Sequence, residues 1–278
     1  MISNLMAQLG NHTNTPLDES LIRHMIINSI RNLNVQFSNE YGEIIIACDS
    51  KNYWRKNYFP YYKASRKKAY ESSEIDWNSI FDFFKKIKAE LREFFKYRVI
   101  EIDEAEADDI IGTLALNFGN FLNTGEKILI ISGDKDFIQL QKYGNIKQYD
   151  PVRKTNITHH NPNDFLVEHI IKGDTSDGVP NILSKSDIFV VGGRQTPLTA
   201  KRLSMYTDMI KTNQEFTDEI KNNFERNKKL IDLSQIPDNI QSKIMSEYEN
   251  QKGKNNSKII TYFIQNKMKL LLEHINDF

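Results

Sequence analysis

The sequence has one cysteine, Cys48, among 278 residues. A single thiol cannot form a disulfide within the chain or build a cysteine-based zinc site. Long apolar runs are also missing: the longest, 44–48 and 128–131, are much shorter than the roughly 20 residues that cross a bilayer. The start of the sequence shows no basic region and no cleavage site, so no signal peptide is predicted. We therefore expect a soluble, cytoplasmic protein with no membrane association.

Charge of one sign is not in excess either. The chain carries 37 basic and 37 acidic side chains, so its formal net charge is zero. The charges are nevertheless segregated, because residues 51–70 contain seven basic side chains and no acidic one, whereas residues 101–109 contain six carboxylates. Local charge decides whether a polyanion can be held near a group of acids, so the neutral total does not exclude a nucleic-acid partner.

Short apolar segments alternate with helical patterns in the first 160 residues. The expected strands are 43–48, 99–102 and 127–132, and the expected helices begin at Thr15-Pro16, Trp77 and about Glu104, the last two ending near Tyr97 and Phe118. This alternation is typical of a parallel sheet buried on both faces. After about Asp164 only 188–191 looks strand-like, and ambiguously so. We predict an α/β domain over 1–160, which includes the basic segment of about 51–75, and a mostly helical domain over 161–278.

Acidic side chains follow the predicted strands or open helices and turns, where the functional groups of open α/β sheets collect. The candidate metal-binding acids are Asp49, Glu106, Asp108, Asp109, Asp134, Asp136, Asp174 and Asp177. Gathered carboxylates repel one another unless cations neutralise them, and oxygen ligands suit Mg²⁺ or Mn²⁺. The pattern predicts a site where two such ions could hydrolyse a phosphodiester.

Each acidic group alone has a simpler interpretation. Asp49 could be a helix N-cap or turn residue, and the acids of 104–109 could only balance a helix dipole. The segments 132–136 and 173–178 could be ordinary turns. The four groups together favour the metal site. His159 and His160 have no ligand-spaced partners and are expected in a surface loop.

The basic segment interleaves aromatic rings with cations, as YWRKNYFPYYKASRKK at 53–68. Cations bind phosphates and rings stack on bases, whereas the alternative is a solvated basic loop whose aromatics pack in the core. The interleaving and the nearby acids favour nucleic acid. We expect the segment to be disordered or mobile without DNA, because its cations repel one another until phosphates bind.

Four segments resemble motifs of the flap endonuclease family of 5′ nucleases, in the same order and at the same spacing. They are FPYYKASR (59–66), EAEADD (104–109), SGDKDFIQL (132–140) and GDTSDGVP (173–180). The segments RHMIINSI (23–30) and LIDLSQIPDNI (230–240) are similar to bacteriophage members of the family. The resemblance therefore covers essentially the whole chain.

The resemblance implies a PIN-like fold with a helix-hairpin-helix-like element in the C-terminal domain. The implied activity is that of a metal-dependent 5′→3′ exonuclease and 5′-flap endonuclease with ribonuclease H activity, which removes RNA primers and adjoining DNA from lagging-strand fragments in phage replication. Its substrates would be DNA and RNA·DNA hybrid with free 5′ ends or flaps, and its cofactors two Mg²⁺, for which Mn²⁺ can substitute. We expect a monomer in the bacterial host cytoplasm, with single-stranded DNA-binding protein as a partner of the C-terminal domain.

The resemblance also assigns roles. The first ion would be held by Asp49, Glu106, Asp108 and Asp109, and the second by Asp134, Asp136 and Asp177, with Asp174 nearby. Lys63 and Arg66 would stabilise the scissile phosphate, so the catalytic set is Lys63, Arg66, Asp49, Asp108, Asp134 and Asp136. The residues expected to contact nucleic acid are Arg55, Lys56, Tyr62, Lys63, Arg66, Lys67, Lys68, Gly173 and Gly178.

Two features depart from the family pattern. The family begins with a strand that ends in a metal-binding aspartate, and Met1 falls where that aspartate is expected, which favours a true start upstream. Residues 181–191 separate the fourth motif from Gly192-Gly193, unlike the family's short hairpin with its monovalent-cation site.

Two other functions stay open. A protein of the same fold that lacks the first aspartate could bind DNA structures without hydrolysing them. Acids after parallel strands also occur in phosphotransfer and phosphatase domains, where Asp49 would be the nucleophile. That second alternative leaves the Tyr-Lys-x-x-Arg segment and GDTSD unexplained.

Overall fold

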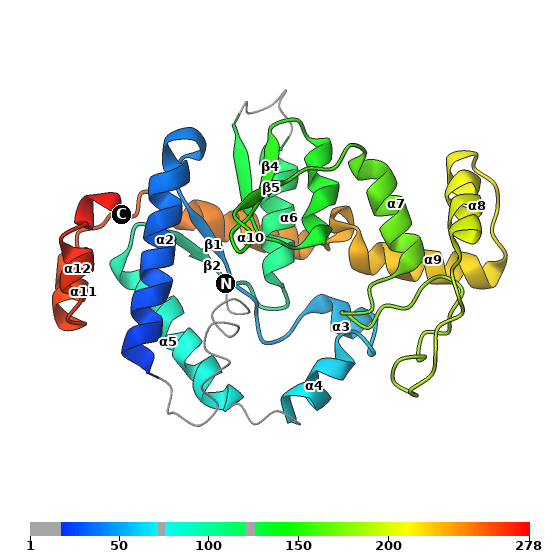
Figure 1. The fold of residues 1–278 in the computed structure, drawn as a ribbon, viewed down its shortest axis with the longest axis horizontal. Coiled ribbons are helices and arrows are strands. Elements are labelled where there is room, and N and C mark those ends of the chain that lie inside the picture. Colours follow the sequence, from blue (N-terminus) through cyan, green and yellow to red (C-terminus); the bar gives the residue numbers. More distant parts are fainter. Residues whose placement is uncertain (1–17, 72–75, 120–125) are drawn as a thin grey trace. The chain divides into compact units, whose positions relative to one another are not determined.

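The computed structural model describes residues 18–71, 76–119 and 126–278 (Figure 1). The predicted helix start at Thr15-Pro16 and the departure at Met1 lie outside the described residues, as do the side chains of Lys67 and Lys68.

The chain divides into two compact units that interleave along the sequence. The first takes in the chain as far as Cys48, the segment that ends at Ile100, and Ser246–Phe278. The second comprises Asp49–Glu71 and Glu101–Met245. Neither unit follows a single boundary near residue 160, and the division into two functional domains stays a prediction.

Two long helices form the framework of the first unit. Helix α2 (Glu19–Tyr41) begins after Asp18, whose Oδ1 accepts a hydrogen bond of 3.0 Å from the Leu21 N–H. Helix α5 (Trp77–Phe94) begins in the same way after Asp76, which accepts from the Ser79 N–H. Each carboxylate satisfies a first-turn donor that has no partner within its own helix.

The core of the first unit joins residues from three distant parts of the sequence. Strand β1 (Ile45–Ala47) pairs in parallel with β2 (Arg98–Ile100), with Ile46 opposite Val99. The C-terminal elements α11 (Ile259–Gln265), α12 (Lys269–Leu272) and η3 (Ile275–Asp277) complete the unit. Their apolar faces share one cluster with α2 and α5, which includes Ile26, Phe83, Phe95, Tyr262 and Phe278.

The second unit has its own sheet. Strands β3 (Ile128–Ile131) and β4 (Ile146–Asp150) are parallel, and β5 (Thr155–Ile157) is antiparallel to β4 (Figure 1). Neither β4 nor β5 is predicted from the sequence, because IKQYD and TNI are not continuous apolar runs. Helix α6 (Ala107–Phe118) and the 3₁₀ helix η1 (Lys135–Lys142) pack with this sheet.

Helices and turns make up the chain from Pro162 to its end. The remaining elements of this region are α7 (Pro162–Lys172), α8 (Ala200–Lys211), α9 (Asp218–Ile231), η2 (Leu233–Gln235) and α10 (Asp238–Asn250). The ambiguous segment 188–191 is a turn. The predicted class, a parallel α/β fold with a helical C-terminal part, is confirmed, whereas the helix-hairpin-helix-like element stays a prediction. Among the described helices none is long and apolar enough to cross a membrane.

The basic segment differs from expectation in its described part. It forms two short helices, α3 (Trp54–Tyr58) and α4 (Ala64–Glu71), rather than a disordered loop. Phe59 and Tyr62 pack in a cluster with Ile170, Val179 and Leu230. Self-repulsion is overcome here because acidic side chains of the same unit neutralise part of the positive charge.

Candidate functional site

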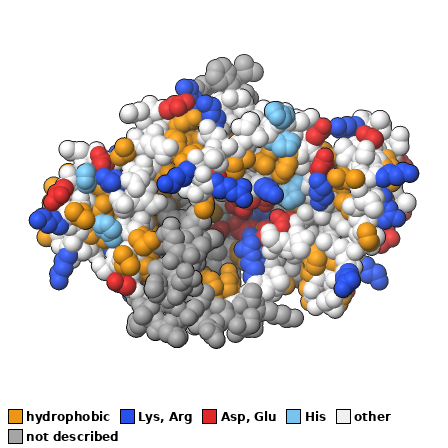
Figure 2. All heavy atoms as spheres, viewed as in Figure 1, with side chains coloured by type: hydrophobic (Ala, Val, Ile, Leu, Met, Phe, Trp, Pro, Cys, Tyr) orange, Lys and Arg blue, Asp and Glu red, His pale blue; other side chains and the backbone are white. Residues whose placement is uncertain are grey.

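All eight predicted metal-binding acids belong to the second unit. Figure 2 shows a group of acidic side chains near the middle of the view, with Lys, Arg and His side chains around it. The acids divide into two groups according to their partners. Glu106, Asp109 and Asp177 pair with Lys or Arg side chains. In the part of the chain that the structure describes, no Lys or Arg forms an ion pair with Asp49, Asp108, Asp134, Asp136 or Asp174.

The acids without a Lys or Arg partner are positioned by the ends of strands and the starts of helices. Asp49 lies just beyond β1, and its Oδ1 accepts 2.8 Å from the Ala107 N–H at the start of α6. Asp134 follows β3 and caps η1, with its Oδ1 3.1 Å from the Asp136 nitrogen. Asp108 is in the first turn of α6. Asp49 therefore acts as a helix cap, and its exposed carboxylate keeps a second oxygen for other ligands.

Asp109 has a different environment. It is fully buried, and its Oδ2 accepts from the Glu106 N–H at 2.8 Å and from the Trp54 indole N–H at 3.2 Å. Its Oδ1 lies 2.8 Å from the Arg55 guanidinium. With these three neighbours, Asp109 fixes the start of α6, so its predicted role as a ligand receives no support from the contacts.

Arg55 is the most deeply buried Lys or Arg paired with these acids. Its guanidinium is 2.9 Å from Glu106 and 2.8 Å from Asp109, and its Nε donates to the Leu230 carbonyl. Although burial lowers its pKa, the charge of Asp109 and the other neighbouring acids raises it more, so the group stays charged. Only 3% of the residue is exposed. In this conformation Arg55 is committed to the two carboxylates, and its contact with nucleic acid stays a prediction.

Lys63 and Arg66 lie against the remaining paired acids. The Lys63 ammonium is 2.5 Å from Glu106 and 3.3 Å from Asp177, and the Arg66 guanidinium is 2.6 Å from Asp177. Burial lowers the pKa of Lys63, but Asp177 and Glu106 raise it more. Lys63 has a left-handed backbone (φ 54°), and its N–H donates 2.8 Å to the Asp177 carbonyl, which holds the two segments together.

Tyr62 is predicted from the sequence to contact nucleic acid, and that contact stays a prediction. In this structure its ring does not face solvent. The ring is buried, and its hydroxyl lies 3.1 Å from Glu106 and 2.8 Å from Asp177. Burial, Asp177 and Glu106 raise the pKa of Tyr62, so the hydroxyl stays protonated and donates. The phenol therefore stabilises the acids from the protein side.

The two predicted glycines shape the turn that carries Asp174 and Asp177. Gly173 (φ 68°) donates to the His169 carbonyl, and Gly178 (φ 73°) donates to the Thr175 carbonyl. These N–H groups are used within the turn and are not available to a phosphate in this conformation. The Asp174 carboxylate accepts from the N–H and hydroxyl of Ser176 and from the Asp177 N–H. The glycines thus have a conformational role in the structure, and their contact with nucleic acid stays a prediction.

The other predicted contact residues differ in exposure. Lys56 on α3 is exposed, and the side chain of Arg66 is 45% exposed although it pairs with Asp177. Lys67 and Lys68 belong to α4, and their side chains lie outside the described residues. Solvent reaches the rings of Tyr58, Tyr61 and Tyr70 in the same segment.

Two of the acids without a Lys or Arg partner, Asp108 and Asp136, have a raised pKa. Burial raises the pKa of Asp108 well above its usual range, and the nearby Asp134 and Asp136 raise it further against the opposing charge of Lys63. Burial, together with Asp134 and Asp174, raises the pKa of Asp136 to about 7, although His169 opposes this. Acids that resist ionisation because they are buried beside other acids fit a cation supplied from solution.

His169 is the residue that sequence reasoning missed. Its side chain, on the last turn of α7, lies between Asp136 and Asp174. Burial lowers the pKa of His169, but the two carboxylates raise it more, and the same contact with His169 helps to lower the pKa of Asp174. The available signal was its spacing, since it precedes Gly173-Asp174 by one helical turn. His159 and His160 show no such contact with the acids.

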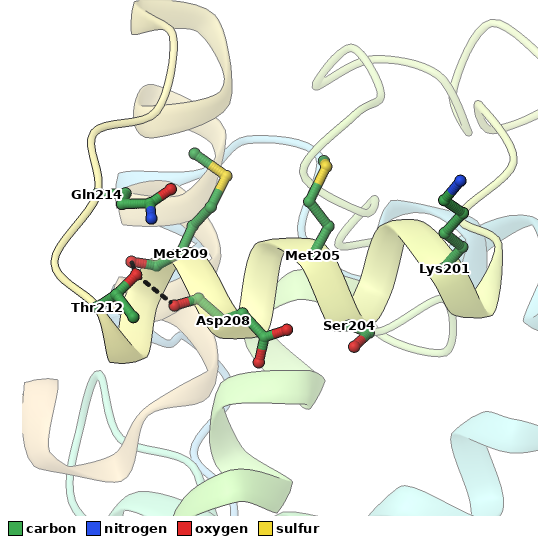
Figure 3. Close-up of a pocket in the computed structure, with 7 residues that line it drawn as sticks. All are labelled: Lys201, Ser204, Met205, Asp208, Met209, Thr212 and Gln214. Atoms are coloured by element: carbon green, nitrogen blue, oxygen red, sulfur yellow. Dashed lines mark hydrogen bonds between the residues drawn. The ribbon is translucent and has the colours of Figure 1, made fainter.

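A shallow depression elsewhere in the second unit is not part of this site. It has a volume of about 500 Å³ and is lined by α8 and the loop after it (Figure 3). Met205, Met209 and Lys201 project from the helix, and the Thr212 hydroxyl donates 2.8 Å to the Asp208 carbonyl. None of the eight acids lines it.

Comparison with known proteins gives a consistent result. Residues 5–169 match the family described as 5′-3′ exonuclease, N-terminal resolvase-like domain, and residues 162–278 match the family described as T4 RNase H, C terminal. The chain is 35% identical over 268 residues to ribonuclease H of Enterobacteria phage T4, covering 93% of this chain and 87% of the relative. The chain belongs to the 5′-3′ exonuclease family.

Other similar proteins are more distant. A 5′-3′ exonuclease of Buchnera aphidicola is 30% identical over 173 residues, which cover 58% of this chain and 56% of the relative. A bacteriophage T5 flap endonuclease, solved in complex with DNA and metal ions, has a TM-score of 0.60 at 16% identity and covers 90% of this chain and 96% of its own. A T5 5′-exonuclease with bound zinc has a TM-score of 0.59 at 17% identity, over 89% and 96%. At these identities the two structures support the fold.

Proposed function

We propose that the chain is a divalent-metal-dependent 5′ nuclease, with 5′→3′ exonuclease, 5′-flap endonuclease and ribonuclease H activities. It would remove RNA primers and adjoining DNA from lagging-strand fragments in phage replication, in the cytoplasm of the host. The observation that carries the proposal is the division of the acidic cluster: Lys63 and Arg66 neutralise Glu106 and Asp177. Among the described residues no Lys or Arg forms an ion pair with Asp108, Asp134 or Asp136. The family of the chain supports the reaction class.

The donor set fits two Mg²⁺ ions, with Mn²⁺ as a substitute. The first ion would be held by Asp49, Glu106 and Asp108, and the second by Asp134, Asp136, Asp174 and Asp177. These ions prefer carboxylate oxygens as ligands. The raised pKa of Asp108 and of Asp136 indicates that a bound cation would stabilise their ionised forms. When bound, the ions would activate water and stabilise the leaving oxygen of the phosphodiester.

The cations of the basic segment would act on the phosphate. Lys63 and Arg66 are already beside the acids, and an ion at Glu106 would leave the Lys63 ammonium free to face the scissile phosphate. Positioned donors of this kind act strongly where water is excluded, and the Lys63 side chain is only 9% exposed. Arg55 and Tyr62 would hold the Glu106 carboxylate in place during cleavage.

The substrate would be DNA or RNA·DNA hybrid with a free 5′ end or flap, bound by a monomer. Lys56, Arg66, Lys67 and Lys68 would contact the backbone, and the exposed rings of Tyr58 and Tyr61 are available to bases. Backbone contacts carry little sequence information, which suits an enzyme that selects structure. We extend the proposal to single-stranded DNA-binding protein as a partner of the helical C-terminal part.

Cleavage of a 5′-labelled flap and of an RNA-primed duplex tests the proposal, with the chain and its Asp134→Asn variant in Mg²⁺ and in EDTA. We expect short 5′ products from the parent in Mg²⁺ only, and none from a folded Asp134→Asn. Equal cleavage by the variant would remove Asp134 from the site. Cleavage that persists in EDTA would contradict the metal dependence.

A further inference from the structure

The imidazole of His169 lies between two carboxylates that come from different turns. Nδ1 is 3.4 Å from Oδ1 of Asp136, at the start of η1, and Nε2 is 3.8 Å from Oδ2 of Asp174, in the turn after α7. One donor atom from each of the three side chains can be chosen so that all lie within 4.8 Å of one another. The set contains two carboxylate oxygens and one nitrogen.

Hydrogen bonding does not account for the Nδ1 atom of this imidazole. Its Nδ1 is buried and has no hydrogen-bond partner, and its nearest carboxylate oxygen is at 3.4 Å. Buried polar atoms in folded proteins are almost always bonded, so an orphan nitrogen at a site needs a reason. The other cations of the cluster behave differently, since Lys63 and Arg66 contact their carboxylates at 2.5 and 2.6 Å. His169 is held close to its two acids without being bonded to them through Nδ1.

We propose that His169 is a nitrogen ligand of the ion held by Asp136 and Asp174, and that it makes this position select Mn²⁺ over Mg²⁺. The inference rests on the proposed metal dependence and adds a residue and a selectivity to it. Mg²⁺ prefers an all-oxygen octahedral shell and seldom accepts imidazole, whereas Mn²⁺ and later transition ions bind nitrogen and oxygen together. The other acids of the cluster offer oxygen only, so the two ion positions would differ in their preference.

The simpler alternative is that His169 is an imidazolium counter-ion that keeps Asp136 and Asp174 together. The two interpretations predict effects of opposite sign. If His169 is a ligand, its removal weakens Mn²⁺ binding more than it weakens Mg²⁺ binding. If His169 is a counter-ion, its removal takes away a positive charge, so both Mn²⁺ and Mg²⁺ would bind at least as tightly as they bind the parent.

Pulsed electron paramagnetic resonance of the Mn²⁺-loaded full chain, without DNA, tests the ligand directly. The sample is prepared at about pH 8.5 so that protons compete little for the imidazole. We expect the ¹⁴N coupling of a directly bound imidazole in the parent and in His160→Gln, an exposed-histidine control, and its loss in His169→Gln. Bound Mn²⁺ without this coupling in the parent would overturn the proposal, whatever the folding of the variant. Coupling that persists in His169→Gln would overturn it as well.

Calorimetric titration with each metal alone tests the selectivity. We expect His169→Gln to lose about tenfold or more in Mn²⁺ affinity at one position, with a change of less than about threefold for Mg²⁺. Equal changes for both metals, or tighter binding of both, would favour the counter-ion and overturn the proposal. Neither measurement uses turnover. A parent that cleaves flaps but shows no ¹⁴N coupling therefore fails only this inference, whereas a parent with the coupling and no cleavage fails only the proposed function.

Discussion

The ammonium group of Lys63 lies 2.5 Å from a carboxylate oxygen of Glu106, and both side chains are more than nine-tenths buried. The same ammonium is 3.3 Å from Asp177, so one cation from the basic segment joins two of the acidic motifs. The basic and acidic segments, which the sequence separates, are thus one electrostatic unit in the structure. A group of acids that a protein cation neutralises in part can be stable before metal binds.

Lys63→Met is expected to slow flap cleavage by roughly 100- to 1000-fold, because it removes a positioned charge from the phosphate. It should also lower the free energy of unfolding in EDTA by roughly 1–3 kcal/mol, since Glu106 stays buried and loses a charged partner. Single-turnover cleavage and urea unfolding measure the two effects. Lys56→Met, at an exposed position of α3, is the control and should leave stability nearly unchanged. Parent-like cleavage by Lys63→Met would exclude the catalytic role.

Arg55→Ala is expected to destabilise the fold rather than merely weaken DNA binding. It leaves the carboxylates of Glu106 and Asp109 without their buried counter-ion, and breaking such a pair costs roughly 3–5 kcal/mol. Urea unfolding compares the stability of Arg55→Ala with that of Lys56→Ala, a control at the exposed neighbouring position. A parent-like midpoint for Arg55→Ala, with weaker DNA binding, would return Arg55 to the nucleic-acid interface.

Gly173→Ala is expected to be much more harmful than Gly253→Ala, although both glycines have positive φ, 68° and 79°. A Cβ at Gly173 would stand 2.4 Å from the Val179 carbonyl oxygen and 2.6 Å from Pro180 backbone atoms, whereas a Cβ at Gly253 meets nothing within 4 Å. The backbone penalty of about 1–3 kcal/mol applies to both, and the clash applies only to Gly173. Thermal unfolding should show a clearly larger loss for Gly173→Ala, and equal losses would contradict the turn geometry.

The sequence predicts much of the fold but only part of the candidate site. The helical periodicity of 77–97 and the apolar runs of β1 and β3 predicted their elements because burial on known faces sets those patterns. The acids were predictable because strand ends and helix starts fix where they lie. The partners were not, since Arg55 meets Glu106 and Asp109 across more than 50 residues of sequence. His169 went unnoticed because its spacing of one helical turn before Gly173-Asp174 does not by itself show that the side chain faces the acids.

Stability in EDTA is expected to depend on pH through Asp136. Burial raises the pKa of Asp136 to about 7, so from about pH 4 to 7 the native state keeps a proton that the unfolded chain has released. The native state binds more protons in this window, and its stability therefore falls as the pH rises. His169, whose pKa is also raised, acts in the same direction.

Urea unfolding at pH 5 and pH 8 checks this with Asp136→Asn, which removes the titrating group. We expect the parent in EDTA to lose more stability than the variant between the two values, and Mg²⁺ at pH 8 to restore the parent but not the variant. An identical pH dependence in the two proteins would show that Asp136 ionises normally in the native state.

The most direct test of the central claim separates binding from hydrolysis on one sample. The chain is first mixed with a 5′-labelled flap in EDTA, binding is measured, and excess Mg²⁺ is then added and quenched at intervals. We expect a bound, intact flap before the addition and short 5′ products after it. A flap that stays bound and intact at every Mg²⁺ or Mn²⁺ concentration would contradict the account and identify the chain as a binder of DNA structure that does not cleave.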